Sequence, residues 1–354
     1  MKALVSFHPI HLDFFETTIE PLVAGQKINP ESFLEAALRL RRSAWRARLY
    51  KQSLELYREQ LEPPPPLTEG TLWDKVRSRL ERLDHKPDTT ARLVAELVEP
   101  DLHVYGRPFL VTEGSAESVG SIVDEYVGAT GDSQIDSLIL EQLIRLDPGL
   151  GKNVQPKEGL DLPADMAYRS ELLASLKELH DLGQAARAGQ QWGRMGDERE
   201  PATEVLVREL PWRSVSLHAR AFPFWIGRDV DGLETICRAA EIAPPEFLVA
   251  ARRLFTRTFD ELPELRQSLQ VELQGPNSVG AFVSPSDIPE LLAFLNDHGS
   301  RMIQVATRHG EGPTCAILLR KIRECAAYAN KHGLAYLEAS GVKPCELEIP
   351  EEAD

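Results

Sequence analysis

The first residues that could do chemistry are His8, His11 and Asp13, three possible metal ligands in the segment HPIHLD. Imidazole and carboxylate groups are the side chains that zinc and non-haem iron sites use. Pro9 prevents a helix from holding the three residues in register. Two interpretations remain: a metal site at these residues with Glu16 nearby, or surface or half-buried histidines at the end of a strand.

A second set of candidates is Arg308, His309 and Glu311 in the run RHGEG. The run resembles the nucleophile loop of histidine phosphatases, which implies that His309 takes a phosphoryl group while Arg308 holds its oxygens. In that family the motif opens the domain and a second histidine follows far downstream, whereas only about 42 residues follow Gly312. We favour the alternative of a glycine-terminated helix and a turn, because Arg and His are favourable near a helix C-terminus.

The basic stretch at residues 39–51, RLRRSAWRARLYK, interleaves cationic side chains with Trp45 and Tyr50. Such a stretch can bind phosphates with aromatic stacking. Glutamates flank it at 31, 35, 55, 59 and 62 on the same expected helix. This pattern favours an amphipathic helix with a solvated, salt-bridged face.

The charge balance bounds the class of partner. The net charge is −15, spread along the chain. This argues against nonspecific nucleic-acid binding, which needs a positive surface. The acidity is compatible with a basic protein partner, and also with a role in solubility alone.

Other sequence features indicate the compartment. The four cysteines form no CxxC pair, which favours a reduced, cytoplasmic compartment. No apolar run approaches the ~20 residues that cross a bilayer, and the first residues do not resemble a secretory signal. No glycine-rich nucleotide motif has the required spacing, so we expect no cofactor.

A helix-rich scaffold must position these residues. Apolar spacing predicts helices over 12–24, 30–61, 72–83, 166–187 and 313–332. Short strands are expected at 2–7, 102–111, 215–224 and 279–283. The segment 189–202 is glycine-rich and polar, which is typical of an exposed connection.

One stretch of the chain is written twice: INPESFLEAALRL at 28–40 and IAPPEFLVAARRL at 242–254 share eight residues. Phe33, Ala36, Ala37 and Leu40 recur at helical spacing. Asn29 and Pro30 suit the start of a helix. The repeat predicts an α+β, helix-rich fold of two related lobes from an internal duplication, at 1–150 and 204–354, joined by a partly helical connection at 151–203. Two units also fit the length, since single cores stop growing near ~250–300 residues.

These features favour a non-enzymatic, cytoplasmic protein-binding module. One specific version is an inhibitor or immunity-type protein that neutralises a basic effector. The alternative is a hydrolase, with its site between the lobes or at a metal near His8, His11 and Asp13. We expect a protein partner, no nucleic acid and no membrane. The oligomeric state does not follow from the sequence.

Overall fold

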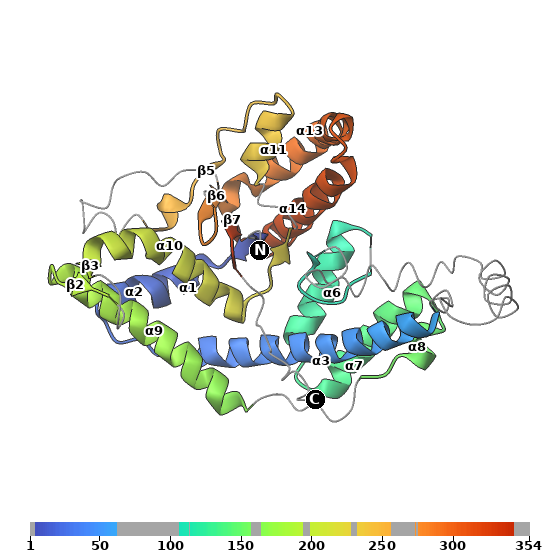
Figure 1. Ribbon diagram of the computed structural model, residues 1–354, viewed down its shortest axis with the longest axis horizontal. Coiled ribbons are helices and arrows are strands. Elements are labelled where there is room, and N and C mark those ends of the chain that lie inside the picture. Colours follow the sequence, from blue (N-terminus) through green and yellow to red (C-terminus); the bar gives the residue numbers. More distant parts are fainter. Residues whose placement is uncertain are drawn as a thin grey trace, which may run out of the picture.

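The computed structural model describes residues 4–61, 106–112, 114–156, 164–193, 199–227, 232–255, 273 and 275–342. Over this part of the chain the fold is helix-rich, with one five-stranded antiparallel sheet (Figure 1). A separate two-stranded ribbon pairs β2 (Gln191–Trp192) with β3 (Glu200–Pro201). The predicted α+β, helix-rich class is confirmed. The helix predicted over 72–83 lies outside the described residues.

Two strands from opposite ends of the chain form the centre of the sheet. The strand order is β4 (Trp225–Ile226), β1 (Val5–Ile10), β7 (Ala335–Ser340), β6 (Val279–Val283) and β5 (Val249–Ala250). β1 pairs with β7 along its whole length, from Val5 opposite Ser340 to Ile10 opposite Ala335. The sheet therefore contains strands from both predicted lobes, and the lobe boundaries stay a prediction.

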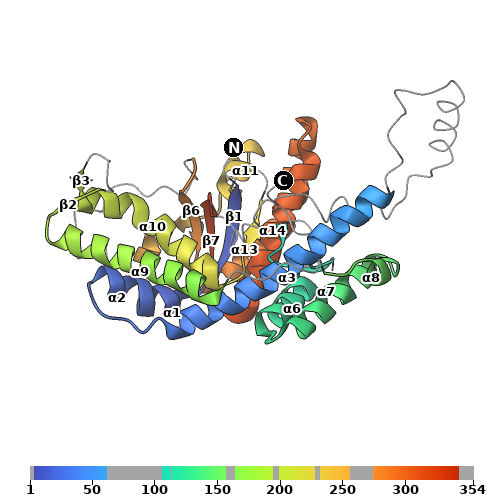
Figure 2. The same cartoon turned by 60° about the horizontal axis from the view of Figure 1, so that its bottom comes forward.

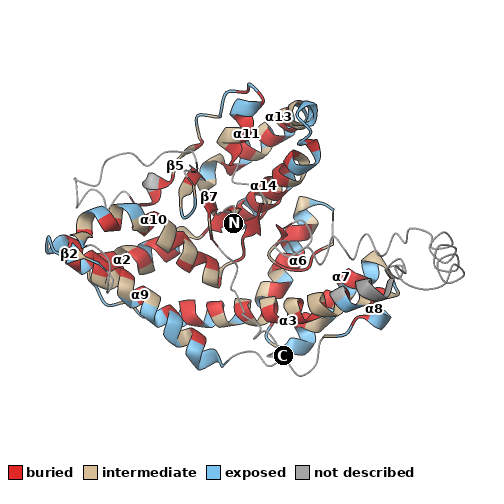
Figure 3. Ribbon diagram, viewed as in Figure 1, coloured by how far each residue is buried: buried red, intermediate tan, exposed pale blue. Residues whose placement is uncertain are grey.

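Hydrophobic cores lie on both faces of the sheet. Successive strand residues point to opposite faces, so Phe7 and Tyr336 enter the first core while Ile10 and Leu337 enter the second. The first core includes residues of α6 (Ala116–Gly128), α7 (Asp132–Leu146), α8 (Leu150–Asn153), α11 (Leu233–Ala239), α13 (Ile288–Arg308) and α14 (Gly312–His332). The second includes residues of α1 (Leu12–Phe14), η1 (Phe15–Ile19), α2 (Glu20–Val23), α9 (Asp165–Arg187), α10 (Ala202–Ala221) and η3 (Ala251–Phe255). Because helices cover both faces, β1 and β7 are buried throughout (Figure 3).

The long helix α3 (Glu31–Leu61) contributes to both cores. Phe33 and Ala37 near its start pack in the second core, and Ala47 and Leu54 further along pack in the first. Figures 1 and 2 show it extending from α2 and α9 to α7 and α8. The helix predicted over 30–61 is therefore confirmed.

The two copies of the repeated sequence fold differently. Residues 28–40 begin α3, whose Glu31 amide donates to the Asn29 side chain at 3.2 Å. Residues 242–254 instead form a turn, β5 and part of η3. Pro244 is followed by Pro245, and a residue before proline is disfavoured in helical conformation. The internal duplication is not confirmed, since the shared window does not form a shared helix.

The other predicted elements agree in part. The helices expected over 12–24, 166–187 and 313–332 correspond to α1 to α2, α9 and α14, and the strand at 279–283 is β6. β1 starts and ends later than the predicted strand at 2–7. The prediction of a strand at 215–224 is wrong, because these residues end α10 and lead into β4. No strand forms in the described residues 106–111. Another short helical segment, η5 (Pro285–Asp287), precedes α13.

Candidate functional site

The structure places His8 within β1 and His11 directly after it, near a third histidine in α10, His218. Nε2 of His8 lies 2.8 Å from the Ser6 hydroxyl, and Nδ1 of His11 lies 3.2 Å from Nε2 of His218. Phe222 stacks on His11 and on His218, with ring centroids 3.9 Å and 4.4 Å apart. The histidines are therefore part of a packed aromatic cluster.

Burial keeps these imidazoles neutral. Desolvation lowers the pKa of His8 to about 3 and the pKa of His218 well below its ordinary value. Desolvation also lowers the pKa of His11 to about 4, with His332 adding to the decrease and exposed Asp13 opposing it. Across the described residues, no group of three or more His, Cys, Asp or Glu side chains is arranged to hold a metal ion. The geometry adds no support to the metal hypothesis.

Arg308, His309 and Glu311 share one exposed turn between α13 and α14. The amides of His309 and Glu311 donate to the Ala306 carbonyl at 3.0 Å and 2.9 Å. Gly310 has a φ of +82°, a left-handed conformation that glycine adopts without strain. This is the helix end and turn that we favour from the sequence.

The described cysteines, Cys237, Cys315 and Cys325, are buried. Desolvation raises the pKa of the Cys237 thiol to about 12 and raises the pKa of the other two thiols. Because the thiolate is the nucleophilic form, these groups behave as core residues. Cys345 lies outside the described residues.

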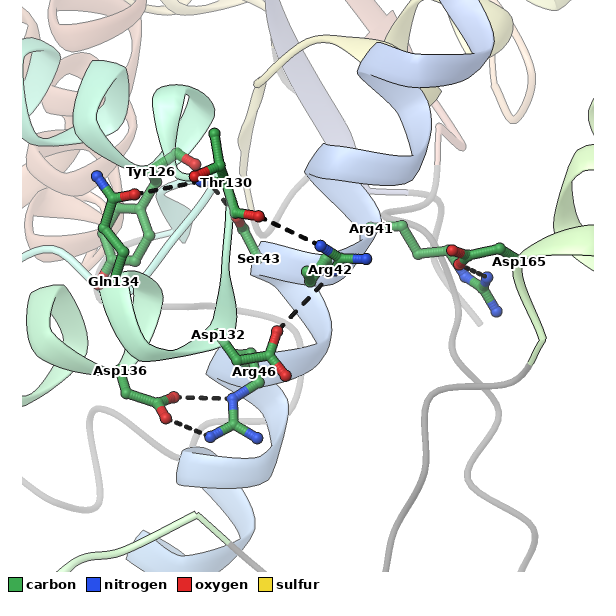
Figure 4. Close-up of polar contacts among 10 residues, drawn as sticks. All are labelled: Arg41, Arg42, Ser43, Arg46, Tyr126, Thr130, Asp132, Gln134, Asp136 and Asp165. Carbon is green, nitrogen blue, oxygen red and sulfur yellow. Dashed lines mark hydrogen bonds and ion pairs between the residues drawn. The ribbon is translucent and has the colours of Figure 1, made fainter.

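The basic stretch at 39–51 uses its arginines to hold neighbouring helices (Figure 4). Nε of Arg46 donates to Asp136 of α7 at 2.8 Å, and Nη1 of Arg41 donates to Asp165 of α9 at 3.4 Å. Trp45 and Tyr50 are buried and so have no face open to a base. The arginines are salt-bridged as predicted, but these two bind aspartates of other helices.

Comparison of the chain with protein-family models, with curated proteins and with solved structures finds no match. Among the described residues, no helix is both long and apolar enough to cross a bilayer. A functional hypothesis must therefore follow from the surface of this molecule.

A groove of about 750 Å³ lies along α9 and α10, which pack side by side. Buried apolar side chains line it, namely Leu172, Leu179, Val205 and Leu217. Trp192 of the β2–β3 ribbon and Trp212 of α10 also line it. The indole N–H of Trp212 donates to the Ser340 carbonyl at 3.0 Å, which ties the groove to the end of β7.

Charged side chains from both helices and from β3 line the same groove. The carboxylates are those of Glu171, Glu178, Glu200 and Glu209, and the guanidinium groups are those of Arg208, Arg213 and Arg220. Nη1 of Arg213 lies 3.1 Å from Glu178, and Nη2 of Arg220 lies 3.7 Å from Glu171, so ion pairs join α10 to α9. With one more glutamate than arginine, the lining has a small negative excess.

This groove is not predicted from the sequence, because the apolar run at 215–224 favours a strand there. A signal is nevertheless present: Arg208, Trp212, Ser216 and Arg220 recur every four residues. Side chains at that spacing share one face of a helix. Trp192 lies in the segment expected to be an exposed connection, and nothing local indicates that it meets α10.

Proposed function

We propose that this protein is a non-enzymatic, acidic protein-binding module whose α9–α10 groove takes a basic segment of a partner. The observation that carries the proposal is the lining, which combines buried apolar residues, two tryptophans and four glutamates against three arginines. Aromatic faces and carboxylates both attract guanidinium and ammonium groups. Tryptophan is also among the residues that dominate binding energy at protein interfaces.

The charge of the whole chain supports a basic partner. A net charge of −15 attracts a cationic protein over several ångströms and speeds the encounter. An inhibitor or immunity-type protein that neutralises a basic effector in the cytoplasm would use this chemistry. Our specific proposal is therefore an inhibitor or immunity-type protein.

The alternative, a hydrolase with its site near His8, His11 and Asp13 or between the predicted lobes, has less support. A general base must reach its proton donor within about 3 Å or through one water. His8 is fully buried, and its Nε2 atom already contacts the Ser6 hydroxyl. The described thiols are buried with raised pKa values, which makes them poor nucleophiles.

Peptide binding to the purified protein tests the proposal. The probes are a short fluorescein-labelled peptide that alternates arginine with leucine and a matched peptide that alternates glutamate with leucine. We expect the arginine peptide to bind more tightly in an anisotropy titration. Ser216→Phe places a ring in the groove without changing its charge and should weaken binding about tenfold or more.

Two further variants control this experiment. Ser175→Phe fills the groove from the α9 side and should act like Ser216→Phe. Ser137→Phe adds the same ring at an exposed position of α7 and should leave binding unchanged. If both groove variants keep their native melting temperatures and bind the arginine peptide as the parent does, the proposed function is wrong.

A further inference from the structure

One guanidinium lies between two carboxylates in the α9–α10 groove. Nη1 of Arg208 lies 2.6 Å from Oε2 of Glu200, and Nη2 lies 3.6 Å from Oε1 of Glu209. The hydrogen bond to Glu200 is the main reason that the pKa of Arg208 is raised. Arg208 therefore holds Glu200 by a hydrogen bond and lies as an ion-pair neighbour beside Glu209.

Two tryptophans belong to the same groove. Trp192 is the register partner of Glu200 in the β2–β3 ribbon, and Trp212 follows Arg208 by one helical turn. Both line the groove together with Glu200 and Glu209. Carboxylates that accept paired N–H bonds and aromatic faces that stack on a planar cation are the groups that recognise arginine.

Arg208 is held much less firmly than its neighbour Arg213. The Arg208 side chain is 57% exposed and that of Glu200 is 44% exposed. Arg213 is only 17% exposed, and it contacts both Glu178 and Glu209. Because exposed ion pairs contribute little free energy, Arg208 can leave at low cost while Arg213 stays in place.

We infer that an arginine side chain of the partner displaces Arg208 and takes its place between Glu200 and Glu209. The inference rests on the proposed function and assigns the class of ligand at this part of the groove, an arginine-bearing polypeptide segment. Arg208 then acts as an internal competitor that lowers affinity for such segments. On displacement its guanidinium is hydrated, so no charge is left buried without a partner.

The test compares two groove variants with variants of equal charge change on α13. Arg208→Gln should bind the arginine–leucine peptide about two- to fivefold more tightly than Arg301→Gln, because an exposed ion pair no longer competes. Glu200→Gln should bind it more weakly than Glu290→Gln, since a carboxylate ligand is lost. Arg301 and Glu290 are exposed positions outside the groove. The two Arg→Gln variants have the same net charge, as do the two Glu→Gln variants, so the members of each pair differ only in the position of the change.

A citrulline–leucine peptide separates guanidinium recognition from apolar contact. Its affinity should be the same for Glu200→Gln and for Glu290→Gln. If Arg208→Gln binds the arginine peptide no more tightly than Arg301→Gln, Arg208 is not a competitor and the inference fails. The proposed function would still stand in that case provided that Ser216→Phe or Ser175→Phe weakens binding, and it fails separately if neither variant has an effect.

Discussion

His11 and His218 are joined by a hydrogen bond that requires a neutral imidazole. The backbone N–H of His11 donates to Nε2 of His218 at 3.2 Å. The second proton of a charged His218 would lie on this nitrogen and face the N–H group. Nδ1 of His218 is buried without a hydrogen-bond partner in the described part of the chain. The contact joins the start of α1 to the last turn of α10 only while His218 is neutral.

Acidification is expected to destabilise the protein through the buried histidines. Histidine in the unfolded chain binds a proton near pH 6.5, whereas desolvation lowers the pKa of His8 to about 3 and that of His218 well below its ordinary value. The stabilisation is therefore fully present above pH 6.5. Below this pH, each fully buried histidine lowers the free energy of unfolding by about 1.4 kcal/mol per pH unit until its folded pKa is reached.

His218→Gln isolates one of these contributions. Glutamine does not titrate and can still accept from the His11 N–H. Below about pH 6.5, urea unfolding should show a free energy of unfolding that falls less steeply with decreasing pH than in the parent, by up to about 1.4 kcal/mol per pH unit, and the two slopes should agree above this pH. His309→Gln, in the exposed turn, should leave the slope unchanged. Identical slopes for His218→Gln and the parent below about pH 6.5 would contradict this account.

Near neutral pH, Glu338 is expected to change the free energy of unfolding in the direction opposite to the buried histidines. Its carboxylate is 1% exposed and accepts from the Leu233 amide at 3.0 Å and from the Tyr336 hydroxyl at 2.8 Å. Desolvation raises its pKa from 4.5 to about 7, so the stabilisation is fully present below pH 4.5 and is lost as the pH rises through about 7.

Glu338→Gln keeps an acceptor oxygen and removes the charge. Relative to the parent, its free energy of unfolding should rise by about 1 to 3 kcal/mol between about pH 5 and pH 8. Denaturant unfolding at the two pH values measures this difference. A constant offset between Glu338→Gln and the parent would show that the carboxyl does not titrate in this range.

Local periodicity predicts the elements whose residues form a clear apolar stripe. Leu172, Leu176 and Leu179 recur at helical spacing in α9, as do Leu318, Ile322 and Cys325 in α14, and both helices form as expected. Strand β7 is not among the strands expected from the sequence, although Ala335, Leu337 and Ala339 alternate with more polar residues, because glutamate is an unusual residue in a buried central strand. The position of β7 depends on pairing with β1 from the opposite end of the chain.

The α9–α10 groove is harder to predict from the sequence than the helices that form it. Residues 215–224 contain an apolar run that resembles a short strand, but Leu206, Leu210 and Leu217 bring α10 against the second core as one helix. Without that helix, Trp212 and Arg208 are not placed on a common face. The contact of His11 with His218 is equally non-local, since no spacing links the two residues.

The buried ion pair of Arg107 and Glu324 is expected to be essential to the first core. Nε of Arg107 donates to Oε2 of Glu324 at 2.9 Å, and both side chains are at most 1% exposed. The Trp225 indole N–H also donates to Glu324, at 3.1 Å. Glu324→Leu leaves a buried guanidinium without this carboxylate and should lower the free energy of unfolding by about 3 to 5 kcal/mol.

The double variant Arg107→Met, Glu324→Leu provides the control. It removes both charges, so it should be less destabilised than Glu324→Leu alone. Denaturant unfolding of the parent, both single variants and the double variant gives the coupling free energy. Additive losses would show that the two groups do not act as a pair.

The close approach of α9 to α2 depends on a glycine. A Cβ atom at Gly183 would lie 2.5 Å from the carbonyl oxygen and 2.8 Å from the Cα atom of Val23, both part of the backbone. Because a backbone cannot move aside as a flexible side chain can, Gly183→Ala must push the two helices apart. We expect a loss of about 1 to 3 kcal/mol in the free energy of unfolding.

Gly128→Ala is the matched control at the end of α6. A Cβ atom there meets no other atom within 4 Å, so alanine should be neutral or stabilise by up to about 1 kcal/mol through its higher helix propensity. Thermal unfolding of the two variants compares the same chemical change in a crowded and an open position. If Gly183→Ala is as stable as Gly128→Ala, α9 and α2 do not pack as closely as the structure shows.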